Sequence, residues 1–318
     1  MTQVKKNKKI IFFGTPLIAA KCLQALIDLG YNVPFIVCQP DKPVGRKKLF
    51  EFSEAKKLAI KKNIEVIQPE NLSEIYEKIK KEKPDLILTC AYGKIIPEKI
   101  LLIPKFKCVN VHASLLPKYR GGAPIHWAII NGDKKTGITL MFMEKGMDTG
   151  NIILKKEIEI SINDNLDSLF LKMENLAYEI VFKNIQILFD KNIYSFAQDE
   201  KKVSFAPNIK RKDEIIDWNK DALVIFNHIR GLNSKIGAFS IYNKVNVKIY
   251  EVEITDKKSI NHPGTIVDNN KKILVATKNF LLEIISLQMA GKKRIYKENI
   301  SSISKNFKLL SKFYKENE

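Results

Sequence analysis

The first 190 residues alternate between short apolar runs and longer stretches in which apolar residues recur every three or four positions. The runs predict buried strands and the longer stretches predict amphipathic helices. The predicted strands are 10–14, 33–38, 65–67, 85–91 and 108–112. This alternation is typical of an α/β protein with a doubly wound parallel sheet, whose ligands bind at the carboxyl ends of the strands.

The pattern changes near residue 190. One long amphipathic helix is predicted over 165–189, and the mixed, polar stretch 190–207 has the composition of a linker. Short strand-like runs then follow at 238–242, 245–249, 264–267 and 273–276. Such runs, separated by turn residues, indicate a smaller β-barrel. We therefore expect a first domain at 1–189, a linker at 190–207 and a second domain at 208–318.

Composition places the chain among ordinary globular proteins, with 45% hydrophobic and 28% charged residues in 318. The amino terminus imitates a signal peptide, because basic residues precede an apolar run. Gly14, Thr15 and Pro16 interrupt that run, however, and a strand, a turn and a helix account better for the same residues. No apolar run approaches the roughly 18 residues that span a bilayer, so we expect no membrane partner.

The formal net charge of +19 favours an acidic partner, with nucleic acid first. Only five of the 54 basic residues are arginine, and this bias towards lysine is also what a coding preference would place on a solvated surface. Residues 211–318 carry +8 of the charge and the remainder carries +11. Charge alone decides between neither interpretation.

Familiar cofactor signatures are missing from the sequence. It contains neither the glycine pattern of a dinucleotide site nor that of a phosphate-binding loop, so we expect no NAD and no ATP. The cysteines lie far apart in apolar stretches, which favours free thiols in a reducing cytoplasm and no metal site. These cysteines are Cys22, Cys38, Cys90 and Cys108.

Two polar residues share one face of the strand predicted at 108–112. Asn110 and His112 lie two positions apart, so their side chains project to the same side. An amide can donate to a carbonyl oxygen that becomes negative, and an imidazole can move a proton near neutral pH. Taken alone, a structural histidine beside a turn-forming asparagine is the more ordinary interpretation.

Two neighbouring segments strengthen the chemical interpretation. The segment Ser114-Leu115-Leu116-Pro117 leaves the strand as an irregular, partly apolar stretch whose main-chain groups could hold a flat heterocycle. Farther on, Asp148 stands between Gly146 and Gly150. Its carboxylate could orient an imidazole and take up a proton from an amine, although an aspartate between glycines is often a turn residue.

Several longer motifs occur together in the chain. They are FGTP at 13–16, QPDKPVGR at 39–46, AYGKIIP at 91–97, NVHASLLPKYRGGAPI at 110–125 and GMDTGNI at 146–152. In this combination the sequence resembles the methionyl-tRNA formyltransferase family of folate-dependent enzymes. The likeness continues through IRGLN at 229–233 and GAF at 237–239, so it covers nearly the whole chain.

This resemblance implies a Rossmann-like catalytic domain followed by an OB-like β-barrel. It implies that the formyl group of 10-formyltetrahydrofolate is transferred to the α-amino group of initiator methionyl-tRNA in the cytoplasm, without a metal. Carried over by position, Asn110 and His112 lie at the formyl group and Asp148 faces them. Ser114 to Pro117 match the folate-binding segment. Arg46, Lys47 and Lys48 match the loop that approaches the tRNA acceptor end.

The sequence departs from the family directly after that loop, where LFEFSEAKK at 49–57 replaces a segment that usually contains proline. Two other functions stay open. An enzyme that formylates a small amine, such as a sugar nucleotide or glycinamide ribonucleotide, would share the same three residues. A non-catalytic tRNA-binding protein would not need them. The basic second domain favours tRNA as the acceptor, because each neutralised phosphate strengthens binding.

Overall fold

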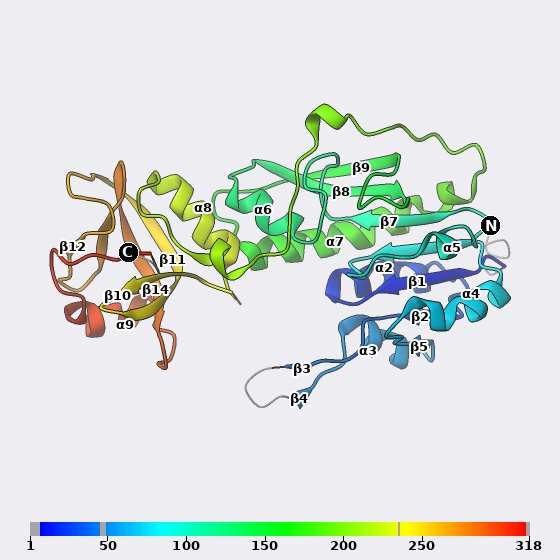
Figure 1. Ribbon diagram of the computed structural model, residues 1–318, viewed down its shortest axis with the longest axis horizontal. Helices are drawn as coiled ribbons and strands as arrows, with labels where there is room; N and C mark the ends of the chain where they lie inside the picture. Colours follow the sequence, from blue (N-terminus) through cyan, green and yellow to red (C-terminus); the bar gives the residue numbers. More distant parts are fainter. Residues whose placement is uncertain (1–6, 45–48, 235, 316–318) are drawn as a thin grey trace. The chain divides into compact units, whose positions relative to one another are not determined.

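The computed structural model describes residues 7–44, 49–234 and 236–315 (Figure 1). The chain forms two compact units. The first consists of Met1–Pro124, Thr136–Ile158 and Phe170–Pro207, and the second of Ile125–Lys135, Glu159–Leu169 and Asn208–Glu318. Among the described helices, none is long and apolar enough to cross a membrane.

A seven-stranded sheet forms the centre of the first unit (Figure 1). Its strand order is β5 (Glu65–Ile67), β2 (Phe35–Val37), β1 (Ile10–Gly14), β6 (Leu86–Cys90), β7 (Cys108–His112), β8 (Lys135–Phe142) and β9 (Ile152–Glu159). The strands from β5 to β7 are parallel, which confirms the predicted α/β sheet. β8 runs antiparallel to β7, and neither β8 nor β9 was predicted.

Helices cover both faces of this sheet. They include α2 (Leu17–Asp28), α4 (Tyr76–Glu82), α5 (Glu98–Leu101) and α7 (Leu166–Asn184). Ile11 of β1 belongs to one buried cluster with Ile79 of α4 and Ile100 of α5. Phe12, the next residue, is also fully buried and points to the opposite face. On that side α2 packs against α7, where the Cys22 thiol lies 3.9 Å from a carbonyl oxygen of α7.

The strand order reverses between β1 and β6, and the end of β1 packs closely against α2 and β6 there. A Cβ atom on Gly14, the last residue of β1, would lie 2.5 Å from the Cβ of Ala19 and 2.7 Å from the carbonyl oxygen of Cys90. Only glycine therefore lets α2 start so close to β6. In open α/β sheets, ligands bind at the carboxyl ends of the strands beside such a reversal.

The stretch predicted as a linker pairs with the first unit. Phe196 exchanges two main-chain hydrogen bonds with Ile152, at 2.8 and 3.0 Å. The Ala206 N–H donates to the carbonyl oxygen of Arg120 at 2.8 Å. The predicted domain boundaries, at 189 and 208, stay a prediction.

The second unit contains an antiparallel sheet. Its order is β10 (Ala238–Tyr242), β11 (Val245–Lys258), β14 (Phe280–Met289), β13 (Leu274–Ala276) and β12 (Ile266–Asp268), with α8 (Ala222–Leu232) before it. Near the end of the chain, Lys312 pairs with Thr265 beside β12, and Tyr314 pairs with Ile241 of β10. The two edges of the sheet are thus joined, as the predicted barrel requires. Neither α8 nor β14 was predicted.

Candidate active site

Three side chains meet at the carboxyl end of β7. Asn110 and His112 lie two residues apart on this strand, and Asp148 reaches them from the loop between β8 and β9. The Asp148 carboxylate lies 3.4 Å from Asn110 Nδ2 through Oδ1 and 3.6 Å from His112 Nδ1 through Oδ2. The structure therefore brings together the three residues predicted from the sequence to do chemistry.

The Asp148 loop is fixed by hydrogen bonds on both sides. The Gly121 N–H donates to Asp148 Oδ2 at 2.9 Å. Gln198 Nε2 donates to the carbonyl oxygens of Asp148 and Gly150, at 2.7 and 2.9 Å. Asp148 itself has a φ of +55°, a left-handed conformation that is uncommon outside glycine. These bonds hold the residue in that conformation and direct its carboxylate at the other two side chains.

The amide of Asn110 has a defined orientation. Thr89 on β6 donates its hydroxyl hydrogen to Asn110 Oδ1 at 2.8 Å. The Asn110 oxygen is thus occupied, and its nitrogen faces Asp148. The 3.4 Å bond to Asp148 is long, and the amide nitrogen carries two hydrogens. Asn110 can therefore donate to a further oxygen atom.

Contacts around the buried His112 ring assign its protons. Nε2 lies 2.9 Å from the carbonyl oxygen of Tyr119. A carbonyl oxygen only accepts, so Nε2 carries a hydrogen. Nδ1, 3.6 Å from Asp148 Oδ2, is then the ring nitrogen left to exchange a proton.

Burial disfavours the protonated form of two other histidines. Burial lowers the pKa of His126 to about 4. Burial also lowers the pKa of His228, whose Nε2 lies 2.7 Å from the carbonyl oxygen of Asp213. In the described part of the chain, no three His, Cys, Asp or Glu side chains form a group that could hold a metal ion.

Comparison with known proteins finds formyltransferases that match nearly the whole chain. The family model "Formyl transferase" matches residues 8–185, and "Formyl transferase, C-terminal domain" matches residues 208–303. The chain is 47% identical over 305 residues to methionyl-tRNA formyltransferase of Malacoplasma penetrans (strain HF-2), covering 96% of each chain. It is 44% identical over 302 residues to that of Staphylococcus aureus (strain MW2), covering 94% of this chain and 97% of that protein. The chain belongs to the methionyl-tRNA formyltransferase family.

Solved structures agree on the fold. The N-formyltransferase from Helicobacter canadensis, solved in complex with folinic acid and dTDP-3-aminofucose, superimposes with a TM-score of 0.69. It shares 24% sequence identity and covers 87% of this chain and 98% of its own. At this identity the likeness concerns the fold alone.

The segment matching the family's folate-binding residues is packed more tightly than the sequence suggested. Thr139 Oγ1 accepts from the Leu116 N–H at 3.1 Å and donates to the Ser114 carbonyl oxygen at 2.6 Å. Leu116 is fully buried, and Ser204 N–H donates to the Pro117 carbonyl oxygen at 3.3 Å. Three main-chain groups of this segment are therefore bonded within the protein. Contact of Ser114, Leu115, Leu116 and Pro117 with folate stays a prediction.

The segment that matches the family's tRNA loop is described only in part, as two short paired strands. Its strands are β3 (Pro43–Val44) and β4 (Leu49–Phe50). Arg46, Lys47 and Lys48 lie outside the described residues, so their role as tRNA contacts stays a prediction.

Sequence reasoning missed a buried arginine behind the three catalytic candidates. Arg120 donates from Nε and Nη2 to Gln198 Oε1, at 3.1 and 2.9 Å, and from Nη1 and Nη2 to Glu200, at 3.3 and 2.7 Å. Gln198 in turn holds the Asp148 loop. One signal could have revealed it: in a chain with so strong a preference for lysine, a retained arginine indicates a site that needs the forked guanidinium.

We expect Gln198→Ala to weaken both the fold and catalysis. The substitution leaves two donors of Arg120 without an acceptor and releases the carbonyl oxygens of Asp148 and Gly150. The free energy of unfolding should fall by about 1–3 kcal/mol, the cost of unsatisfied buried donors. Urea unfolding measures this loss, and kcat should fall with it. Glu200→Gln is the matched control: the Glu200 side chain is 72% exposed, so it should change stability much less. Equal stability of the Gln198→Ala and parent proteins would contradict the bracing role.

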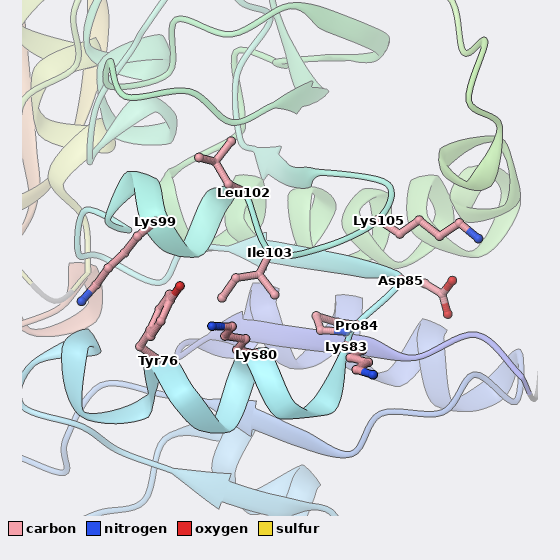
Figure 2. A pocket seen from close by; sticks show the side chains of 9 residues that line it. All are labelled: Tyr76, Lys80, Lys83, Pro84, Asp85, Lys99, Leu102, Ile103 and Lys105. Carbon is pink, nitrogen blue, oxygen red and sulfur yellow. The ribbon is translucent and has the colours of Figure 1, made fainter.

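A hollow of about 680 Å³ lies away from these residues, at the amino ends of β6 and β7 (Figure 2). Its lining includes Lys80, Lys99, Leu102 and Asp85, which directly precedes β6. The Asp85 carboxylate accepts from the Lys9 N–H at 3.0 Å. Because parallel strands present their carboxyl ends at the other edge, this hollow is not part of the candidate active site.

Proposed function

We propose that this protein transfers the formyl group of 10-formyltetrahydrofolate to the α-amino group of methionine on initiator tRNA. The product is the formylmethionyl-tRNA that starts translation, and the reaction takes place in the cytoplasm. The observation that carries the proposal is the meeting of an amide donor, an imidazole and a carboxylate at the ligand edge of the sheet, in a chain that matches this family almost end to end. The folinic acid bound by the Helicobacter canadensis protein supports a folate as the donor.

The reaction begins when the neutral amine attacks the formyl carbon. An α-amino group titrates near ~7.7–8.0, so an appreciable fraction is neutral at physiological pH. Attack gives a tetrahedral oxyanion. Asn110 Nδ2 and the protonated His112 ring donate hydrogen bonds to this oxyanion, whose charge is absent from the substrate.

One proton must then change place. The attacking nitrogen loses a proton as it becomes an amide nitrogen, and N10 of tetrahydrofolate gains one as the C–N bond breaks. The protonated ring has no free nitrogen, so Asp148 accepts the first proton. His112 Nδ1–H then protonates the leaving nitrogen and recovers a proton from Asp148, whose Oδ2 lies 3.6 Å from Nδ1. Atoms and charge balance in this scheme.

The two parts of the chain divide the work in this proposal. Residues 1–189 carry out catalysis and bind folate through Ser114 to Pro117. Residues 208–318 bind tRNA, together with Arg46, Lys47 and Lys48 of the first domain. The +8 charge on residues 211–318 supports an RNA partner for the second domain.

The direct test is formyl transfer by one purified sample to several acceptors. We expect transfer to initiator methionyl-tRNA and little or none to a sugar-nucleotide amine or glycinamide ribonucleotide. Transfer to a small amine in preference to tRNA would establish the alternative enzyme. Absence of transfer to all of them would favour a non-catalytic tRNA-binding protein.

Binding of tRNA should depend steeply on salt. Each phosphate that lysine or arginine neutralises releases counterions, so affinity should fall by tenfold or more between about 50 and about 200 mM salt. Folate binding should change little. Reversing the exposed charges of Lys292 and Lys293 to glutamate should flatten the dependence, which filter binding measures at each salt concentration. A tRNA affinity that is independent of salt would assign the lysine excess to coding bias instead.

A further inference from the structure

Two large aromatic side chains of the partly described hairpin are open to solvent. Phe50, on β4, is 71% exposed, and Phe52, just after this strand, is 47% exposed. Phe50 pairs with Pro43 across the hairpin. We propose that these two phenylalanines form a stacking surface for an unpaired nucleobase in the single-stranded 3′ end of the acceptor tRNA. This inference rests on the proposed function.

The base of the hairpin is fixed by an ion pair. Lys56 on α3 (Glu54–Lys61) pairs with Asp41, and its ammonium nitrogen lies 4.0 Å from the centre of the Phe52 ring. The same nitrogen donates to Gln68 Oε1 at 2.6 Å. Gln68 also donates, through Nε2, to the carbonyl oxygen of Gln39 at 2.8 Å. The Lys56 ammonium thus contacts the Phe52 ring, and its bonds to Asp41 and Gln68 fix its own position.

The same network reaches the edge of the sheet where ligands bind. The Gln39 N–H donates to Thr15 Oγ1 at 3.1 Å, and Gln39 Nε2 donates to the carbonyl oxygen of Tyr92 at 2.9 Å. Thr15 directly follows β1, and Tyr92 follows β6. Phe52 is therefore linked, through Lys56 and these hydrogen bonds, to the carboxyl edge that also carries Asn110 and His112, where the aminoacyl end of the acceptor has to arrive.

Chemistry favours a nucleobase over an apolar protein partner. Residues 45–48, which lie between β3 and β4 in the sequence, are GRKK, and their positive charge would attract a phosphate backbone and repel basic proteins. Glu51, the acidic residue between the two phenylalanines in the sequence, forms an ion pair with Lys57 at 2.9 Å. Exposed aromatic rings beside basic groups are the usual means of holding single-stranded nucleic acid without reading its sequence. A stacking role would also account for LFEF at 49–52, where the sequence departs from the family pattern.

Stacking predicts a change in affinity for the acceptor without a change in chemistry. We expect Phe50→Ala to raise KM for methionyl-tRNA about 30-fold, the middle of the range for one stacked base, and to leave kcat within about twofold. Phe50→Trp should restore the parent KM, because it offers a larger ring face. The loss should be equal at low and high salt, whereas loss of a lysine contact shrinks as salt rises. Leu102→Ala is the matched control, since Leu102 is 78% exposed at the opposite end of the parallel strands.

A spectroscopic readout separates stacking from a structural effect. Initiator tRNA carrying 2-aminopurine in its single-stranded 3′ end should lose fluorescence on binding to the parent protein and to Phe50→Trp, and much less on binding to Phe50→Ala at saturation. An unchanged KM for Phe50→Ala, or equal quenching by the parent and Phe50→Ala proteins, overturns the proposal. Failure of the proposed function looks different, because the parent protein would then not formylate methionyl-tRNA at all.

Discussion

Replacing His112 by alanine is expected to lower kcat for formyl transfer by about 10²–10⁴-fold, the contribution of one positioned acid–base group. The reason lies in the geometry of the ring. Nε2–H is anchored on the Tyr119 carbonyl oxygen at 2.9 Å, which leaves Nδ1 to exchange a proton beside Asp148 at 3.6 Å. Alanine removes the proton carrier and one of the two donors to the oxyanion.

A second variant distinguishes loss of chemistry from loss of structure. In His112→Gln the side-chain amide can still donate to the Tyr119 carbonyl oxygen, but it has no nitrogen that can take up and release a proton. We expect this variant to melt close to the parent protein, to bind folate and yet to be nearly as slow as His112→Ala. Single-turnover rates over a range of pH measure this. Parent-like activity in either folded variant would end the acid–base assignment.

The sequence pattern located some elements to the residue and missed others for a physical reason. β1, β5, β7 and β10 coincide with the predicted runs 10–14, 65–67, 108–112 and 238–242, because these strands are short and bounded by polar or turn residues. β8 escaped prediction because glycine weakens a strand pattern. In the structure Gly137 is needed there, since a Cβ atom on it would lie 2.1 Å from the carbonyl oxygen of Lys156 on β9.

The residues of the candidate site could likewise be predicted only in part from the sequence. Side chains that can do chemistry, such as Asn110 and His112, can be found from residue type and spacing. The groups that orient them often cannot. The Tyr119 carbonyl oxygen and the Gly121 N–H are main-chain groups, which every residue has. Gln198 acts at the site from within a stretch whose polar composition predicts only a linker.

Substitution of Asn110 is expected to have the second large effect on kcat, because of the way its amide is oriented. Because Thr89 donates to Oδ1, the Asn110 nitrogen is directed at Asp148 and at any oxyanion formed beside it. Asn110→Asp keeps the acceptor for Thr89 but replaces the donor by a second carboxylate oxygen. We expect kcat to fall by at least about 10²–10³-fold, the cost of removing one donor to an oxyanion.

The new carboxylate also lies next to an existing one. Two carboxylates at the 3.4 Å separation of Asn110 and Asp148 cannot both be ionised without a large penalty, so the pKa of one of them rises and the pair tends to share a proton. That proton would stabilise the folded variant as pH falls. The variant should therefore gain stability relative to the parent between pH 8 and pH 5, which thermal melting at each pH measures.

Two companion variants separate these effects. Asn110→Ala removes the donor without adding charge, so it should lose a similar part of kcat but show the parent's dependence of stability on pH. Thr89→Val leaves the amide in place and removes the hydroxyl that orients it, so it should be only mildly slower. If Asn110→Asp kept a parent-like kcat, Asn110 would not be a donor to the oxyanion, and the stabilisation of the tetrahedral intermediate would have to come from His112 and main-chain groups alone.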